Sequence, residues 1–148
     1  MNMMRLNRDA ARCLRGFQPS AVTDITGFGL LGHGFEIAHR SGARLEIEAS
    51  RVPCLPGAQA CARAGSRTSA HPRIRAYLGH QLEFASTVDG ATRDVLLDPQ
   101  TSGGLLVAVS EDQAGALVEQ FGRADLPIWR IGRVVAGTGV SVTLGHAD

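Results

Sequence analysis

The segment at residues 23–33 limits what this chain can fold into more than any other stretch. It reads Thr-Asp-Ile-Thr-Gly-Phe-Gly-Leu-Leu-Gly-His, so one carboxylate, Asp24, lies between the hydroxyls of Thr23 and Thr26. An apolar pattern follows that can pack one face of a helix. The segment therefore predicts a short strand that ends at an acid, turns on glycines and enters a helix.

The glycines of this segment, Gly27 and Gly29, allow the backbone to approach a ligand closely or to take a positive φ. The first N–H groups of a helix attract anions. An adjacent carboxylate suits the Mg²⁺ that accompanies nucleotide phosphates. This pattern predicts a phosphate and metal site with Asp24 as the metal ligand. The alternative is a plain strand-to-helix turn in which Asp24 only caps the helix.

A second polar segment, Asp-Pro-Gln-Thr-Ser-Gly-Gly at residues 98–104, precedes an unbroken apolar run. The hydroxyls and N–H groups of Thr101, Ser102 and Gly103 are suited to a phosphate pocket or to a subunit interface. The alternative is a surface turn in which Asp98 bonds the backbone ahead of it.

Composition narrows the classes of function. A chain of 148 residues predicts one compact domain, and a net charge of +1 gives no sign of a nucleic-acid or anionic-membrane partner. The chain has no lysine, which excludes a lysine nucleophile or a Walker-type lysine within it. Three scattered cysteines without a C-x-x-C pair favour a reducing cytoplasm. We expect no signal peptide and no membrane span.

Hydrophobic periodicity predicts alternating helices and strands. Helices are expected at residues 8–15, 30–40, 58–64, 91–97 and 111–121. Strands are expected at 21–25, 43–49, 105–109, 128–135 and 140–144, with an edge strand at 81–85. The run at 105–109 is typical of a central strand, and residues 105–135 predict a right-handed β-α-β crossover between parallel strands. Because the other elements do not alternate cleanly, the predicted class is α+β: a mixed β-sheet with helices packed on it.

Several residues mark the ends of these elements. Asn7 is placed to cap the first helix, and Gly42 to stop the second in a left-handed conformation. Ser110 and Gln113 have the spacing of a capping box, and Gly122 is expected to end that helix.

Some polar and aromatic side chains admit two interpretations. His33 has the chemistry of a ligand or a base, although a histidine at the start of an apolar helix is more often structural. Residues 65–72 predict a mobile loop; Arg67, Arg73 and Arg75 in and beside it can clamp phosphate or simply face solvent. Trp129, in an apolar strand pattern, is expected in the core.

Together, residues 23–33 and 98–106 resemble the C-terminal half of selenophosphate synthetase (selenide, water dikinase). Shorter stretches at residues 6–7, 55–57 and 131–134 support the resemblance, which covers nearly the whole chain. The related aminoimidazole ribonucleotide synthetases have a Thr-Gly-Gly-Gly-type turn in place of Thr-Gly-Phe-Gly-Leu-Leu-Gly-His. The implied fold is the C-terminal domain of aminoimidazole ribonucleotide synthetase-like proteins.

The resemblance implies a reaction in which ATP, selenide and water give selenophosphate, AMP and phosphate. It also implies a cytoplasmic homodimer with two domains in each subunit. The N-terminal domain of the family carries the glycine-rich lid, the reactive cysteine or selenocysteine, a lysine and most of the acidic Mg²⁺ ligands. The C-terminal domain adds one Mg²⁺-ligating aspartate, whose position matches Asp24.

Residues 1–148 are accordingly expected to form a single C-terminal domain that lacks the N-terminal ATP-binding domain and any catalytic residue. ATP would be bound mainly by that missing partner domain, with Thr23, Thr26, Gly27, Gly29, Thr101, Ser102 and Gly103 contributing from this side. The chain departs from the family at residues 65–74, where a Pro-Gly-Gly turn and an Arg-Asn pair are usual and Ile74 replaces the asparagine.

A different class of function remains open. The chain can instead be a non-catalytic interaction or dimerisation module that has diverged from such a domain. A further alternative is another ATP-binding synthetase of the same superfamily, against which Phe28 and His33 argue.

Overall fold

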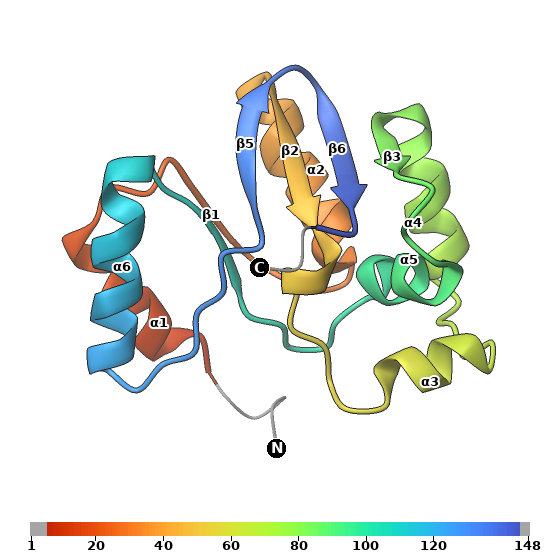
Figure 1. The fold of residues 1–148 in the computed structure, drawn as a ribbon, viewed down its shortest axis with the longest axis horizontal. Coiled ribbons are helices and arrows are strands. Elements are labelled where there is room, and N and C mark those ends of the chain that lie inside the picture. Colours follow the sequence, from red (N-terminus) through yellow and green to blue (C-terminus); the bar gives the residue numbers. More distant parts are fainter. Residues whose placement is uncertain (1–5, 146–148) are drawn as a thin grey trace.

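A computed structural model describes residues 6–145 of the chain as two parts, each with its own hydrophobic core. The larger part is a four-stranded sheet covered by helices, and the smaller part is a pair of helices beside a two-stranded ribbon (Figure 1). The mixed sheet confirms the predicted α+β class. The helices are short, and none in the described part is long and apolar enough to cross a membrane.

The larger sheet has the strand order β3-β6-β2-β5. Its strands are β2 (Ala43–Glu48), β3 (Leu82–Phe84), β5 (Gly132–Ala136) and β6 (Gly139–Thr143). Strand β6 runs parallel to β2 and to β3, whereas β5 runs antiparallel to β2. Although β5 and β6 are consecutive, they lie on opposite sides of β2, so the turn between them passes over the end of β2 (Figure 1).

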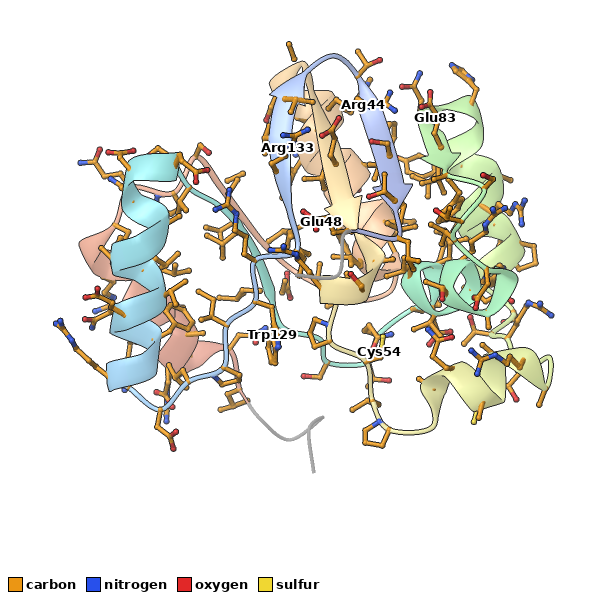
Figure 2. All side chains as sticks on the ribbon, viewed as in Figure 1. Arg44, Glu48, Cys54, Glu83, Trp129 and Arg133 are labelled. Carbon is orange, nitrogen blue, oxygen red and sulfur yellow. The ribbon has the colours of Figure 1, made fainter. Side chains whose placement is uncertain are left out.

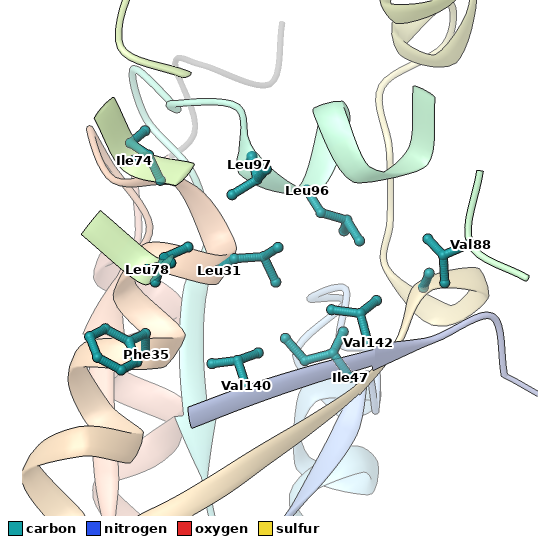
Figure 3. Close-up of a cluster of buried hydrophobic side chains, with 11 residues drawn as sticks. Leu31, Phe35, Ile47, Ile74, Leu78, Val88, Leu96, Leu97, Val140 and Val142 are labelled. Atoms are coloured by element: carbon teal, nitrogen blue, oxygen red, sulfur yellow. The ribbon is translucent and has the colours of Figure 1, made fainter. Parts of the chain in front are cut away.

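The two faces of this sheet follow the strict alternation of β2. On the inner face, Ile47 of β2 and Val140 and Val142 of β6 are almost fully buried (Figure 3). On the outer face, Arg133 Nε donates to Glu46 Oε2 across 2.7 Å, and Arg44 pairs with Glu83 across the strands (Figure 2). One face therefore supplies the core and the other a ladder of solvated ion pairs.

Helices cover the inner face. Helix α2 (Gly29–Ser41) packs on the strands with Leu31, and helix α5 (Gly90–Leu97) packs on α2 with Leu97; neither leucine has exposed surface (Figure 3). The remaining helices of this part are α3 (Ala58–Arg63) and α4 (His71–Leu78). Helix α2 ends where predicted, because Gly42 takes a left-handed conformation with φ 60°.

The smaller part is built on the antiparallel pair β1 (Ala21–Asp24) and β4 (Leu105–Ala108). The predicted central strand and parallel β-α-β unit are therefore wrong, since β4 pairs with β1 and β5 belongs to the other sheet. The apolar run has a different cause: Leu105 and Val107 pack on the core of the smaller part, while Leu106 lies beside α2 at Gly34.

The helices of the smaller part are α1 (Arg8–Cys13) and α6 (Glu111–Arg123). Asn7 and Ser110 hold the predicted N-cap positions, but neither side chain makes the expected cap bond. Asn7 makes no cap bond, because its Nδ2 donates to Gly103 O at 3.1 Å. Ser110 also makes none, and Gln113 Oε1 instead accepts the Gln18 N–H at 3.4 Å. Helix α6 continues through Gly122.

Two further predictions differ from the structure. The loop expected at residues 65–72 ends early, because α4 begins at His71 with Pro72 in its first turn. Trp129 is 53% exposed and not in the core, since β5 begins only at Gly132 and the residues before it link α6 to the sheet.

The glycine at the start of α2 gives a test of the fold. Gly29 has φ 66°, and a Cβ there would lie 2.7 Å from Asp98 O. We expect Gly29→Ala to lower the free energy of unfolding by about 2 kcal/mol or more, through left-handed strain and overpacking. The control is Gly115→Ala in α6, where nothing lies within 4 Å and about 0.5–1 kcal/mol of stabilisation is expected. Urea unfolding of both variants measures the difference; equal effects would contradict the close approach.

Candidate functional site

The two motif segments, far apart in sequence, form one backbone unit. The Ile25 N–H donates to Gly104 O at 2.9 Å, and the Gly103 N–H donates to Ile25 O at 3.0 Å. The Gln100 N–H donates to Thr26 O at 2.9 Å. These bonds extend the β1–β4 ladder past the end of both strands, so the acid of the first motif and the hydroxyls of the second lie at one end of the ribbon.

The glycines of the two motifs allow close approach of the protein's own backbone. At Gly29, the N–H donates to Thr26 O at 2.9 Å, and the Cα faces the carbonyl of Asp98. At Gly103, a Cβ would lie 2.5 Å from Ile25 O. Gly27 differs, because the space around it is open within 4 Å and it is exposed. Gly104 of the second motif is likewise exposed with nothing within 4 Å, so Gly27 and Gly104 leave room for a ligand.

Asp24 lies exposed at the end of β1. Its carboxylate has no hydrogen bond or ion pair to any residue between 6 and 145, and the Thr23 hydroxyl donates only to the Asp24 main-chain oxygen, at 3.2 Å. The N-cap of α2 is Phe28, with no side-chain cap bond. The interpretation of Asp24 as a helix cap is therefore wrong.

The donor set at Asp24 fits part of a Mg²⁺ site. Mg²⁺ in proteins takes oxygen ligands and is commonly held by one or two carboxylates together with phosphate oxygens and waters. An exposed, unpaired carboxylate meets that need. Among the described residues, however, no group of three histidine, cysteine or acidic side chains is placed to hold a metal. This chain offers one carboxylate, and further ligands would have to come from substrate, water or another protein segment.

His33 connects the first motif to helix α2. Its Nε2 lies 3.1 Å from Thr26 Oγ1, and its Nδ1 lies 3.1 Å from Glu36 Oε2. The His33 side chain is only 11% exposed, and the Phe28 ring meets it edge-on at 5.7 Å. Glu36 is not among the site residues predicted from the sequence, although its i,i+3 spacing from His33 on a helix is a signal for such a pair.

The second motif presents its hydroxyl residues to solvent. Thr101 and Ser102 are exposed and Gly103 is half-buried. The turn before them is held by Gln100, whose Nε2 donates to Asp98 O at 3.1 Å. Burial raises the pKa of the Asp98 carboxyl, and the nearby His71 imidazole lowers it in part.

Arg67 is engaged within the protein. Its Nε and Nη2 donate to Asp94 Oδ2 at 2.9 and 2.5 Å, and this carboxylate raises the pKa of Arg67. Buried His71 approaches the other oxygen of Asp94 at 3.1 Å, without the alignment of a hydrogen bond. Arg67 therefore anchors its loop to α5, whereas Arg73 and Arg75 lie exposed on α4.

Two hollows in the described surface are lined by other residues. One, of about 470 Å³, is open and lined by residues 50–53 and 128–130, including Trp129 (Figure 2). None of the predicted site residues lines it. Cys54, on the connector next to it, is exposed, but partial desolvation by the surrounding protein raises the pKa of its thiol, which disfavours the nucleophilic thiolate.

The chain matches a known protein family over almost its whole length. Residues 1–145 match the family described as AIR synthase related protein, C-terminal domain. This chain belongs to that family. The match includes both motif segments and confirms the family relationship that they indicate.

The chain is similar in sequence to curated proteins named selenide, water dikinase. The chain is 42% identical over 119 residues to the selenide, water dikinase of Clostridioides difficile (strain 630), covering 80% of this chain and 34% of the relative. It is 40% identical over 136 residues to that of Pseudomonas straminea, covering 90% of this chain and 38% of the relative. The chain thus spans a little over a third of the length of these relatives.

Solved structures agree on the fold. The thiamine-monophosphate kinase of Stenotrophomonas maltophilia K279a is 30% identical with a TM-score of 0.51, over 87% of this chain and 32% of that one. The structure titled AaThiL complexed with AMPPCP and TMP is 19% identical with a TM-score of 0.52, over 90% of this chain and 33% of that one. The second likeness shows the fold alone.

Two aspartates should show opposite pH effects on stability. Folding raises the pKa of Asp98, so the charged Asp98 carboxylate lowers the stability of the folded state at pH values above its unfolded pKa of about 4. Asp98→Asn should therefore raise Tm at neutral pH. This gain in Tm should disappear in acid, where the carboxyl is protonated in both states. The N–H of Thr92 lowers the pKa of the cap residue Asp89, so Asp89→Asn should lower Tm at neutral pH, with the loss vanishing in acid. Thermal unfolding of the two variants and the wild type, from neutral pH to below pH about 4, measures both changes in Tm. Tm shifts of the same sign at neutral pH would contradict the burial of Asp98.

Proposed function

We propose that this chain is the C-terminal domain of a selenide, water dikinase, an enzyme that makes selenophosphate, AMP and phosphate from ATP, selenide and water. The observation that carries the proposal is the unit formed by the two motifs, at whose end the Asp24 carboxylate has no partner among residues 6–145. Support comes from the 40–42% identity to proteins of that name, which extends over most of this chain.

Asp24 is the proposed Mg²⁺ ligand. A bound Mg²⁺ would neutralise the charge of the polyphosphate as it is cleaved. The backbone pairing between Ile25 and Gly103 fixes the carboxylate at the end of the ribbon, where Gly27, Thr101 and Ser102 offer open backbone or exposed hydroxyls to the phosphate groups. We further propose that the remaining ligands and the nucleophile belong to an N-terminal domain, in a cytoplasmic homodimer.

A chimera tests the assignment. This chain should replace the corresponding third of the Clostridioides difficile relative and leave selenide-dependent formation of AMP from ATP. Asp24→Asn in the chimera should lower the rate and raise the Mg²⁺ requirement by at least about tenfold, with the fold intact. The control is Asp112→Asn, at an exposed aspartate in the first turn of α6, which should leave both unchanged. A folded but inactive chimera would favour a non-catalytic interaction module, and an unaffected Asp24→Asn chimera would contradict the ligand role.

The chain alone should not turn over ATP. One unpaired carboxylate is too few ligands for a metal cluster, and the described residues show no activated nucleophile beside it. The measurement is AMP release from ATP by the purified 148-residue chain with Mg²⁺ and selenide. Selenide-dependent AMP formation by this sample would contradict the proposal that the nucleophile and the remaining metal ligands belong to another domain.

A further inference from the structure

Glu36 determines which nitrogen of His33 carries a proton. The contact is 3.1 Å between Glu36 Oε2 and His33 Nδ1. A carboxylate can only accept a hydrogen bond, so Nδ1 must be the donor. In the neutral imidazole the other nitrogen, Nε2, then has no proton and is an acceptor.

The acceptor Nε2 determines the direction of the Thr26 hydroxyl. Thr26 Oγ1 lies 3.1 Å from His33 Nε2, so the hydroxyl donates its only proton inward to the ring. The ring is held in this orientation by its burial and by the edge contact with Phe28. Thr26 therefore keeps only its lone pairs for a ligand. Such an oxygen can bind a cation but has no proton to give to a phosphate.

Asp24 provides a second oxygen on the same side of the chain. Ile25 is 8% exposed and points into the protein, and the backbone ladder to Gly103 and Gly104 keeps this stretch extended. In an extended chain, the residues before and after Ile25 project to the opposite side. The Asp24 carboxylate has no partner among the described residues. Two oxygen acceptors without a donor match the chemistry of a hard cation.

We propose that Glu36 and His33 are positioning residues, which make the Thr26 hydroxyl an acceptor that holds a divalent cation together with Asp24. The sequence patterns placed Thr26 among the residues that contribute to ATP binding, whereas the direction of its hydroxyl makes it a cation ligand. A catalytic role for this cation rests on the proposed function. The chain of hydrogen bonds from Glu36 through His33 to Thr26, called the relay below, does not.

Nitrogen NMR of the 148-residue chain tests the relay. At mildly alkaline pH, His33 should show a protonated Nδ1 and an unprotonated, pyridine-like Nε2. Glu36→Ala should abolish this preference for one tautomer, and Glu119→Ala, which removes an exposed carboxylate paired to Arg123 on α6, should leave it intact. A protonated Nε2 in the wild-type chain, or a tautomer unchanged in Glu36→Ala, would overturn the proposal.

Mn²⁺ and inorganic phosphate are the probes for the ligand class. Mn²⁺ should broaden the amide signals of residues 24–26 in the chain alone, as weak paramagnetic binding does. The broadening should persist in Thr26→Ser, which keeps the hydroxyl, and weaken by about tenfold in Thr26→Val and in Asp24→Asn. Equal broadening in Thr26→Val and the wild type, or a response of Thr26 to phosphate instead of Mn²⁺, would overturn the proposal.

These results are separable from the proposed function. An inactive chimera with the expected NMR results would reject the dikinase assignment and keep the relay. An active chimera with a protonated His33 Nε2 would keep the assignment and reject the relay.

Discussion

The backbone pairing of residues 25–26 with residues 100–104 is the constraint on which the rest of the structure depends. It joins the ends of β1 and β4 and brings Gly29 against the carbonyl of Asp98. That approach fixes where α2 begins and so directs Leu31 into the core of the larger part. The same turn anchors α1, because Asn7 donates to Gly103 O. Both cores and the exposed Asp24 therefore share one junction of hydrogen bonds.

Much of the fold can be predicted from local patterns. The alternation around Ile47 predicts β2, and Gly42 predicts the end of α2, because both signals depend only on neighbouring residues. The failures concern distant partners. Asn7 has the chemistry of a cap, but its side chain bonds a carbonyl far along the chain. The apolar residues 105–109 indicate a strand that is buried on both faces. Helices of the smaller part cover one face and α2 of the larger part covers the other, so the burial does not require a central position in a sheet.

In the candidate site, too, local features can be predicted from the sequence, whereas contacts between distant residues cannot. Its two segments are recognisable as motifs, and the family match confirms their kinship. Their glycines, by contrast, mainly serve contacts within the protein, which local sequence cannot distinguish from contacts to a ligand. Arg67 looks like a phosphate clamp in the sequence, but Asp94, on a helix that is remote in sequence, binds it. The polarity of the Thr26 hydroxyl depends on Glu36, three residues beyond His33, and emerges only once α2 sets their geometry.

Amide hydrogen exchange at the junction tests the central claim, that two remote motifs form one unit. The amides of Ile25, Gln100 and Gly103 should exchange as slowly as those of a core strand such as β2, because each is bonded across the junction. In the strained variant Gly29→Ala, their protection should fall together. Exchange of the Gln100 and Gly103 amides at the rate of an open surface loop, while β2 stays protected, would contradict the account.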